Sequence, residues 1–374
     1  MPGIPKSMRL SLCALAAALA APAATAASAA QPALMYLSVW PHQIDVVDAD
    51  QGKVVDHIQL NTDVVRQLVL SPDKTKLYAG TLADNSIVTI DLATRKVLDS
   101  FSLDSGNRKN RLSAMAIDPT GRYLYSVDTV ITKELDRYDI AKPRFVVIDL
   151  QAKGITRTAE LPSGADAPGY RDSLKASPDG KYLYVFRNGI SVYDTSNFAL
   201  VKKIDLHRPP EPDMLNLSLD LVDDPNEAPD KVIGLFNSSD PFVHREIFGI
   251  AEINLENLSF DLTPIGPVTT TMMSPLMLTP DRKLGYTAVV NGEQGNRITE
   301  FWVFDMETKK IIAKKAFIGR TRFNFGMTAD GANLLIYNAG FQIEVYDAKT
   351  LEMTHDIDLG GDTTSNLIVM PEGQ

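Results

Sequence analysis

The sequence predicts an all-β fold, a seven-bladed β-propeller of four-stranded antiparallel blades, because two short patterns each recur seven times along the chain. One pattern is a turn of the Pro-Asp-Gly type between two apolar runs. The other is a run of alternating apolar residues that closes on an acid or an amide. Each repeat spans roughly 49 residues, and propeller repeats are typically about 40 to 50 residues long. Four short strands fit into one repeat, so each repeat is expected to form one blade.

The turn pattern is expected to join the first and second strands of each blade. Proline presets its own φ angle, and Asp, Asn and Gly tolerate the left-handed positions of a tight turn. The seven copies, of which the fourth is weak, occupy residues 71–74, 118–121, 177–180, 223–226, 279–282, 328–331 and 370–373.

The second pattern is expected to form the third strand of each blade, since alternating apolar residues suit a strand packed against a neighbouring sheet. Its copies occupy residues 44–48, 87–91, 145–149, 190–194, 250–254, 301–305 and 343–347. The carboxylates that close six of these runs are expected to be structural, because Asp accepts hydrogen bonds from the N–H groups of the turn that follows. They are Asp48, Asp91, Asp149, Asp194, Asp305 and Asp347.

The order of the strands predicts how the ring closes. The first repeat begins at Tyr36 without an opening strand, whereas residues 365–370 supply an opening strand that no further strand follows. We therefore expect the C-terminal strand to complete the N-terminal blade, which leaves no free sheet edge inside the ring.

Residues 1–30 are expected to be a cleavable signal peptide, and residues 31–374 to form the seven-bladed propeller. Lys6 and Arg9 precede an apolar stretch at 10–21, and small residues at alternate positions follow it, as signal peptidase requires. The mature protein is therefore expected in the periplasm. The alternative is an uncleaved membrane anchor, but a span needs about 20 apolar residues and this stretch is shorter. No membrane association is expected after cleavage.

The single cysteine, Cys13, lies inside that apolar stretch and follows Leu12, where a lipoprotein signal needs a small residue. Lipidation is therefore not expected. A mature chain without cysteine can form no disulfide, thiolate metal site, iron-sulfur cluster or covalent c-type haem attachment of its own. A redox cofactor linked to its function would be bound by another chain.

Charge gives a further limit on the class of partner. Once Lys6 and Arg9 are removed, the chain carries 35 basic against 47 acidic residues, a net charge of −12. Nucleic acid and anionic membranes require concentrated positive charge, so neither is expected as a partner. The same balance is also ordinary for a soluble secreted protein.

The sequence predicts no catalytic residue and no metal site. His42, His57, His207, His244 and His355 are scattered singly, without the paired spacing of metal ligands. No Gly-rich phosphate loop and no Gly-x-Ser-x-Gly motif is present.

Function is expected at the end of the ring opposite the uniform turns. In an antiparallel meander the first and third connections lie at one end, and the second and fourth lie at the other. The second end collects the long, irregular connections, and insertions on one face usually hold the function of a repeat fold. These connections are residues 128–144, 206–215, 238–246, 264–274 and 291–299.

Four arginines predict a basic opening at that end, because each lies six to eight residues before the turn proline of its blade, or before the equivalent Ala329, and so just ahead of the innermost strand. They are Arg66, Arg111, Arg171 and Arg322. Guanidinium groups form bidentate pairs with carboxylates, so the opening could attract a carboxylate ligand or an acidic partner. The alternative is that each arginine pairs with an acid of the adjacent blade and holds the ring together.

Aromatic, histidine and methionine residues in or beside the same connections are further candidates for partner or ligand binding, since clusters of exposed apolar side chains mark docking surfaces. The alternative is that they fill gaps between blades. With Arg137 of the third-blade insertion, these candidates are Trp40, His42, Tyr138, Tyr170, Phe242, His244, Met273 and Phe323.

The runs at 177–185 and 190–194 resemble the YVTN-type propeller repeat, a functionally mixed class. The insertion at 134–145 and the segment 346–352 resemble the β subunit of quinohemoprotein amine dehydrogenase, and the similarity extends over nearly all of the mature chain. The resemblance implies a non-haem propeller subunit in a periplasmic complex. It also implies two partners, since in that family a separate small subunit bears the tryptophylquinone and a di-haem cytochrome subunit bears c-type haem.

Two hypotheses follow. The first is a non-catalytic subunit that docks those partners during the oxidative deamination of primary amines. The second is a free-standing periplasmic YVTN-type propeller that acts as a ligand-binding or scaffold protein, with lactonase-like activity as a lesser variant. A pyrroloquinoline quinone enzyme is disfavoured, because those enzymes resemble eight-bladed rings with recurrent tryptophans, and this chain has only Trp40 and Trp302.

Overall fold

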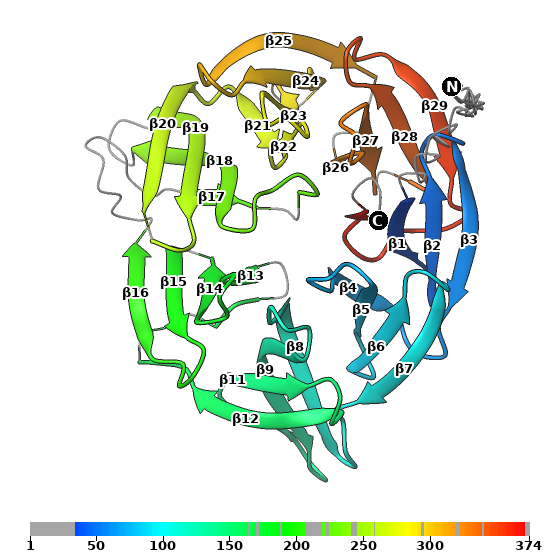
Figure 1. Ribbon diagram of the computed structural model, residues 1–374, viewed down its shortest axis with the longest axis vertical. Helices are drawn as coiled ribbons and strands as arrows, with labels where there is room; N and C mark the ends of the chain where they lie inside the picture. The colour runs from blue at the N-terminus through cyan, green and yellow to red at the C-terminus, as the bar shows by residue number, and fades with distance from the viewer. Residues whose placement is uncertain are drawn as a thin grey trace, which may run out of the picture. The chain divides into compact units, whose positions relative to one another are not determined.

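The computed structural model describes residues 34–163, 165, 167–169, 172–187, 189–205, 218–221, 224–240, 245–257, 259–292, 295–318, 322–338 and 340–370. This part of the chain forms seven antiparallel sheets arranged as the blades of a propeller (Figure 1). The prediction of a seven-bladed, all-β ring is confirmed. In the part of the chain that the structure describes, no helix is long and apolar enough to cross a membrane.

Within each blade, consecutive strands step outward from the centre of the ring to its rim (Figure 1). The first blade contains β30 (Ile368–Val369), β1 (Leu34–Val39), β2 (Gln43–Asp48) and β3 (Lys53–Gln59). The second contains β4 (Val65–Leu70), β5 (Lys76–Thr81), β6 (Ser86–Asp91) and β7 (Lys96–Ser102). The third contains β8 (Arg108–Ile117), β9 (Tyr123–Lys133), β11 (Arg144–Asp149) and β12 (Gly154–Glu160), with β10 (Tyr138–Ile140) added beside β9.

The other four blades follow the same plan. The fourth contains β13 (Ser173–Ala176), β14 (Tyr182–Phe186), β15 (Gly189–Asp194) and β16 (Leu200–Asp205). The fifth contains β17 (Ser218–Asp220), β18 (Lys231–Asp240), β19 (Arg245–Asn254) and β20 (Phe260–Pro267). The sixth contains β21 (Thr270–Met273), β22 (Met277–Leu278), β23 (Leu284–Asn291), β24 (Ile298–Asp305) and β25 (Lys310–Phe317). The seventh contains β26 (Asn324–Met327), β27 (Asn333–Tyr337), β28 (Gln342–Asp347) and β29 (Met353–Asp358).

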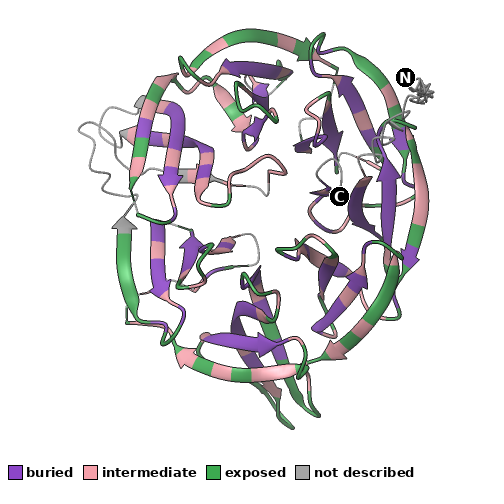
Figure 2. Cartoon of the chain, viewed as in Figure 1, coloured by how far each residue is buried: buried purple, intermediate pink, exposed green. Residues whose placement is uncertain are grey.

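The hydrophobic core lies between the blades. Side chains alternate across a strand, so the two faces of a middle strand pack against different neighbours. In β1, Tyr36 packs with the second blade, whereas Met35 and Leu37 pack with the seventh. Figure 2 shows buried residues on the middle strands and mixed, largely exposed residues on the rim strands. The rim strand has a neighbour on one side only, and this explains its polar alternation.

The turn-closing carboxylates have the structural role predicted for them. Asp149 accepts hydrogen bonds from the backbone N–H groups of Gln151 and Ala152, both at 2.9 Å. Each of the other five carboxylates accepts a backbone N–H bond from the turn after it: Asp48, Asp91, Asp194, Asp305 and Asp347. These interactions hold the turns at one end of the ring in a uniform shape.

Ring closure also agrees with the prediction. β30 pairs antiparallel with β1, so the last strand of the chain is the innermost strand of the first blade. The Met370 N–H donates to the Leu34 carbonyl at 2.9 Å, and the Ser38 N–H donates to the Ser365 hydroxyl at 3.0 Å. The two ends of the propeller are thereby joined within one sheet.

Several connections predicted to be irregular are extended strands instead. The third blade keeps its ladder from Asp128 to Lys133 on β9 and adds β10 within the predicted connection 128–144. In the fifth blade the pairing of β18 with β19 runs as far as Asp240 and Arg245. Continued pairing satisfies backbone groups that an irregular loop would leave to water. The predicted connection 206–215 and the turn 370–373 lie wholly or largely outside the described residues.

Candidate functional site

One end of the ring collects the second-to-third strand connections and the connections between blades. In the first blade, Val39 pairs with Gln43 at this end, and Leu34 pairs with Asp48 at the other. We call this end the loop face. Its described segments are 40–42, 60–64, 82–85, 103–107, 134–143, 161–163, 165, 167–169, 172, 187, 268–269, 292, 295–298, 318, 322–323, 338, 340–341 and 359–367.

The loop face carries most of the large exposed apolar side chains found in the described chain. Leu135 and Ile318 are fully exposed, and Trp40 is 60% exposed. The other members on this face are Leu82, Tyr138, Ile140, Ile298 and Phe341. The remaining exposed large apolar residues lie on rim strands: Val97, Leu98, Leu200, Val201, Ile312 and Met353. Exposed apolar residues that gather at one end of a molecule are typical of an interaction surface.

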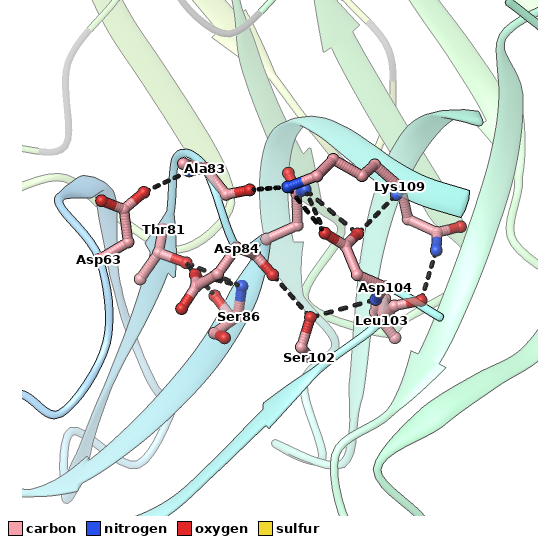
Figure 3. A network of polar contacts seen from close by, with 11 residues as sticks. Asp63, Thr81, Ala83, Asp84, Ser86, Ser102, Leu103, Asp104 and Lys109 are labelled. Carbon is pink, nitrogen blue, oxygen red and sulfur yellow. Dashed lines mark hydrogen bonds and ion pairs between the residues drawn. The ribbon is translucent and has the colours of Figure 1, made fainter. Parts of the chain in front are cut away.

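A polar network joins the second and third blades on the loop face (Figure 3). The Lys109 ammonium donates to the Ala83 carbonyl at 2.7 Å and lies 3.6 Å from the Asp104 carboxylate. The Asn85 amide donates to both oxygens of Asp104 at 3.2 Å, and the Ala83 N–H donates to Asp63. The network fixes the connection after β5 against the start of β8, so this part of the surface is preorganised.

The structure places three of the four predicted arginines. Arg66 lies on β4 and donates to the Leu112 carbonyl at 2.5 Å and to the Ser113 carbonyl at 3.4 Å. It therefore contacts the inner strand of the next blade through backbone carbonyls. Arg111 on β8 and Arg322 ahead of β26 are both exposed. Arg171 lies outside the described residues.

The third-blade insertion projects from the ring as an arm, built from β8, the end of β9, and β10 (Figure 1). Arg137 and Tyr138 lie at its exposed end. Arg137 is paired with two acids of the same segment, Asp139 at 2.9 Å and Asp136 at 3.6 Å. Its charge is therefore largely neutralised locally.

Met273 lines a cavity of about 240 Å³ between the fifth and sixth blades. β18 contributes Asn237 and Ser239, β19 contributes Glu246, and β21 contributes Met273 and Thr270. Within the described structure, the buried Oδ1 of Asn237 has no hydrogen-bond partner. An unsatisfied buried acceptor beside a carboxylate suits a ligand that donates hydrogen bonds, such as an organic ammonium group.

The other candidates have separate positions. Trp40 and His42 are exposed together in the connection after β1. Phe323 was predicted as a surface candidate, but it is only 6% exposed and packs edge-on against Phe317. Its burial between the sixth and seventh blades corrects that expectation and supports the gap-filling alternative for this residue. Tyr170, Phe242 and His244 lie outside the described residues.

Two buried carboxylates escaped the sequence analysis as candidates. The side chains of Asp45 on β2 and Asp128 on β9 are both inaccessible to solvent. Burial raises the pKa of Asp128, against the opposing effect of Arg144, which lies 3.2 Å away. Burial likewise raises the pKa of Asp45, against its hydrogen bond to His57. Each acid interrupts an apolar run in the sequence. A charged residue within such a run indicates a buried carboxylate, so this pattern could have identified both residues.

The structure was also searched for side chains that could bind a metal ion. Among the described residues, no group of three or more His, Cys, Asp or Glu side chains is placed to hold a metal ion.

Comparison with known proteins gives the fold. No protein-family model and no curated protein sequence matches the chain. The structure is similar to the periplasmic gluconolactonase of Pseudomonas aeruginosa, with a TM-score of 0.55, 11% identity, and coverage of 91% of this chain and 99% of that chain. It is similar to a hydrazine synthase chain of Kuenenia stuttgartiensis, with a TM-score of 0.53, 15% identity, and coverage of 85% and 98%.

A third similar structure is a functionally unknown protein from Desulfotomaculum acetoxidans, with a TM-score of 0.52, 11% identity, and coverage of 91% and 99%. These identities support a shared fold only, and one propeller architecture hosts many unrelated functions. By fold, the chain is a seven-bladed β-propeller.

Proposed function

We propose that this chain is the non-catalytic propeller subunit of a periplasmic amine dehydrogenase complex. In this proposal, residues 1–30 are removed on export, and the loop face of the mature chain docks a quinone-bearing small subunit and a c-type di-haem cytochrome subunit. Those partners carry the tryptophylquinone and the haem for the oxidative deamination of primary amines. The proposal takes these partners from the resemblance of the insertion at 134–145 and the segment 346–352 to the β subunit of that family.

The concentration of exposed apolar side chains on the loop face supports the docking role most strongly. Trp40 and Ile318 stand on this face with most of their surface accessible. Aromatic and large aliphatic side chains dominate the energy of protein interfaces once they are buried by a partner. The absence of cysteine after Cys13 is consistent with cofactors on separate chains.

The proposal is tested by removing the docking side chains without touching the core. The tagged protein is purified from its native periplasm at low salt, and haem absorbance is measured per mole of propeller. A Trp40→Ser and Ile318→Ser double variant should lose most of the haem. The control double variant Leu98→Ser and Ile312→Ser removes two apolar residues from rim strands, which are 55% and 57% exposed. It should keep the haem.

Equal retention by the two double variants would refute docking through the loop face. A colourless wild-type preparation would refute the dehydrogenase-subunit proposal itself.

The cavity at Asn237 favours a second candidate function, a free-standing ligand-binding propeller. Its acceptor-rich lining selects hydrogen-bond donors, whereas the exposed Arg111 and Arg322 would select a carboxylate. Calorimetric titration with ethylammonium and with acetate distinguishes the two sites. If ethylammonium gives a heat of binding with the wild type but not with Asn237→Leu, the cavity is supported as the ligand-binding site. If neither ethylammonium nor acetate gives a heat of binding, this second function is contradicted.

A further inference from the structure

We propose that β10 pairs with β10 of a second copy of this chain, so that two propellers join through their arms as a weak dimer with two-fold symmetry. The inference goes beyond the proposed function, because it needs no partner subunit. Three observations carry it: an open strand edge, a balance of charge that favours neither sign of partner, and an order of residues that is complementary to itself.

The open edge follows from the hydrogen bonds of the arm. The Ala141 N–H donates to the Val130 carbonyl, and the Glu134 N–H donates to the Arg137 carbonyl. In an antiparallel pair, hydrogen-bonded residues alternate with residues whose backbone groups point away from the partner strand. The backbone N–H and C=O groups of Tyr138 and Ile140 therefore point away from β9. Among the described strands, β10 pairs with β9 alone, and such an open edge recruits another chain.

The charge around β10 selects neither an acidic nor a basic partner. Arg137 lies 2.9 Å from Asp139 and 3.6 Å from Asp136. An acidic or a basic chain would meet as much repulsion as attraction here, whereas a second copy brings the same balanced set. The segment 131–142 has three basic and three acidic side chains: Lys133, Arg137 and Lys142, and Glu134, Asp136 and Asp139.

The order of residues in β10 is complementary to itself. Tyr138 and Ile140 lie on either side of Asp139, and both have outward backbone groups. When a two-fold axis passes at Asp139, Tyr138 of each copy stands opposite Ile140 of the other. Each of these opposed pairs then exchanges both of its N–H···O bonds, as hydrogen-bonded antiparallel pairs do. This register therefore satisfies the outward groups of both residues in both copies.

The side chains on one face of the arm also suit this register. Tyr138 is 64% exposed and Ile140 is 69% exposed. Ile131 stands opposite Ile140 on β9, so it lies on the same face. In the dimer, Ile131 and Ile140 of one copy and Tyr138 of the other form a continuous row across the joined sheets. Cross-strand pairs of aromatic and β-branched side chains stabilise a sheet.

The opposite face brings the two Asp139 carboxylates together. Each keeps its own Arg137, which is diagonal to Asp139 of the other copy, so the charges of the two pairs cancel. A register centred on Tyr138 would oppose Arg137 and Asp139 directly. It would, however, match the outward groups of Ile140 with Asp136, which lies in the bend before β10, and their hydrogen bonds would be lost. Backbone hydrogen bonding therefore favours the register centred on Asp139.

The dimer should be weak. β10 has three residues, whereas a stable interface uses about 20–30 residues on each side. The arm projects from the ring, which leaves its edge accessible to a second copy (Figure 1).

Sedimentation velocity of the pure chain over a range of concentrations measures the monomer–dimer equilibrium. Ile140→Pro removes the outward N–H of residue 140, while Asp139 and Ala141 keep the ladder to β9. The dissociation constant of the dimer should rise at least about fivefold, because one hydrogen bond is lost from each copy.

Ile140→Val is the matched control, because it keeps the N–H and a β-branched side chain. It should dimerise nearly as well as the wild type. Both variants should melt at the wild-type temperature, since residue 140 lies on an exposed strand. A wild type that stays monomeric at every concentration, or equal dissociation constants for the two variants, would overturn the proposal.

A single cysteine tests the register, since a Cys13→Ser chain has no other thiol. Residues opposed in an antiparallel pair without hydrogen bonds have Cα atoms about 4.5 Å apart, within the disulfide range of about 4.4–6.8 Å. Asp139→Cys should therefore cross-link two copies on mild oxidation. Tyr138→Cys should not, because residue 138 stands diagonal to its own copy.

Leu98→Cys, at a rim position that is 55% exposed, measures cross-linking by random collision. Cross-linking on a non-reducing gel that is strongest for Asp139→Cys would support the proposed pairing. Cross-linking that is strongest for Tyr138→Cys, or no stronger for Asp139→Cys than for Leu98→Cys, would overturn it.

Discussion

Asn366 and Leu68 exchange two hydrogen bonds across the junction between the first and second blades. The Leu68 N–H donates to the Asn366 Oδ1 at 2.9 Å, and the Asn366 side-chain amide donates to the Leu68 carbonyl at 3.0 Å. Leu68 lies on the inner strand β4 and is fully buried. The closing segment of the chain is therefore held to the next blade as well as to its own.

Replacing this amide should destabilise the propeller. Asn366→Ala leaves the buried N–H and C=O of Leu68 without partners, and the free energy of unfolding should fall by about 1–3 kcal/mol. Denaturant unfolding measures the change. Asn107→Ala removes one exposed hydrogen bond to Lys133 and should change stability by less than about 0.5 kcal/mol. Equal effects from the two variants would show that the Asn366 bridge has no special role.

Loss of the closing strand should have a larger effect. A chain that ends at Ser365 lacks β30 and the buried Ile368 and Met370, and each buried side chain of this size contributes about 1.5–3 kcal/mol. The edge of β1 is also left open, so aggregation on heating should increase. Thermal melting compares this chain with one that ends at Met370, which keeps these contacts. If both melt like the full-length protein, β30 does not hold the ring closed.

Gly249 should be intolerant of any side chain. A Cβ atom at this position would lie 2.2 Å from the Thr263 carbonyl oxygen and 2.6 Å from ring carbons of Phe236. Gly249→Ala should therefore lower the free energy of unfolding by about 1–3 kcal/mol through overpacking. The matched control is Gly266→Ala on β20, where a Cβ atom would meet nothing within 4 Å. A stability of Gly249→Ala at or above that of the control would contradict the packing described here.

Stability should decline in acid as the turn carboxylates are protonated. A hydrogen bond from the Ser177 hydroxyl, together with contacts from Lys181, lowers the pKa of Asp179 from its ordinary value of 3.8 to about 2. Because the pKa is lower in the folded state, the stability from Asp179 is present above pH 3.8 and is lost as pH falls towards about 2.

The same group allows a direct check. Ser177→Ala removes the hydroxyl hydrogen bond that contributes most to the lowered pKa of Asp179. The pKa of Asp179 should therefore rise towards 3.8, and protonation of Asp179 in acid should destabilise the variant less than the wild type. Carboxyl carbon shifts followed by NMR through an acid titration report the pKa of Asp179 in both proteins. An Asp179 that titrates at 3.8 or above in the wild type would contradict the prediction.

The repeat pattern predicts the fold because turn chemistry and strand alternation are local properties. Asp149 ends its strand and caps its turn through residues only two or three positions away, so sequence alone is enough. Ring closure is also predictable from the sequence. The first repeat lacks its opening strand and the C-terminal end of the chain has an extra one, so β30 can complete only the first blade, by pairing with β1.

The candidate surface was less predictable because exposure depends on contacts between distant segments. Trp40 and Phe323 are both aromatic residues in connections, yet the first is exposed and the second packs against Phe317. Arg66 bonds to carbonyls of the next blade, and a sequence cannot reveal a backbone acceptor 46 residues away. The cavity beside Asn237 depends in the same way on the meeting of β18, β19 and β21.

In the proposed function, this propeller serves an amine-oxidising complex whose redox cofactors lie on other chains. The most direct measurement is the visible spectrum of the fraction purified through the tagged chain from its native periplasm, before and after addition of a primary amine. We expect c-type haem bands in the same chromatographic peak as the propeller, and we expect the amine to reduce the haem. A colourless monomer, or haem that the amine does not reduce, would contradict it.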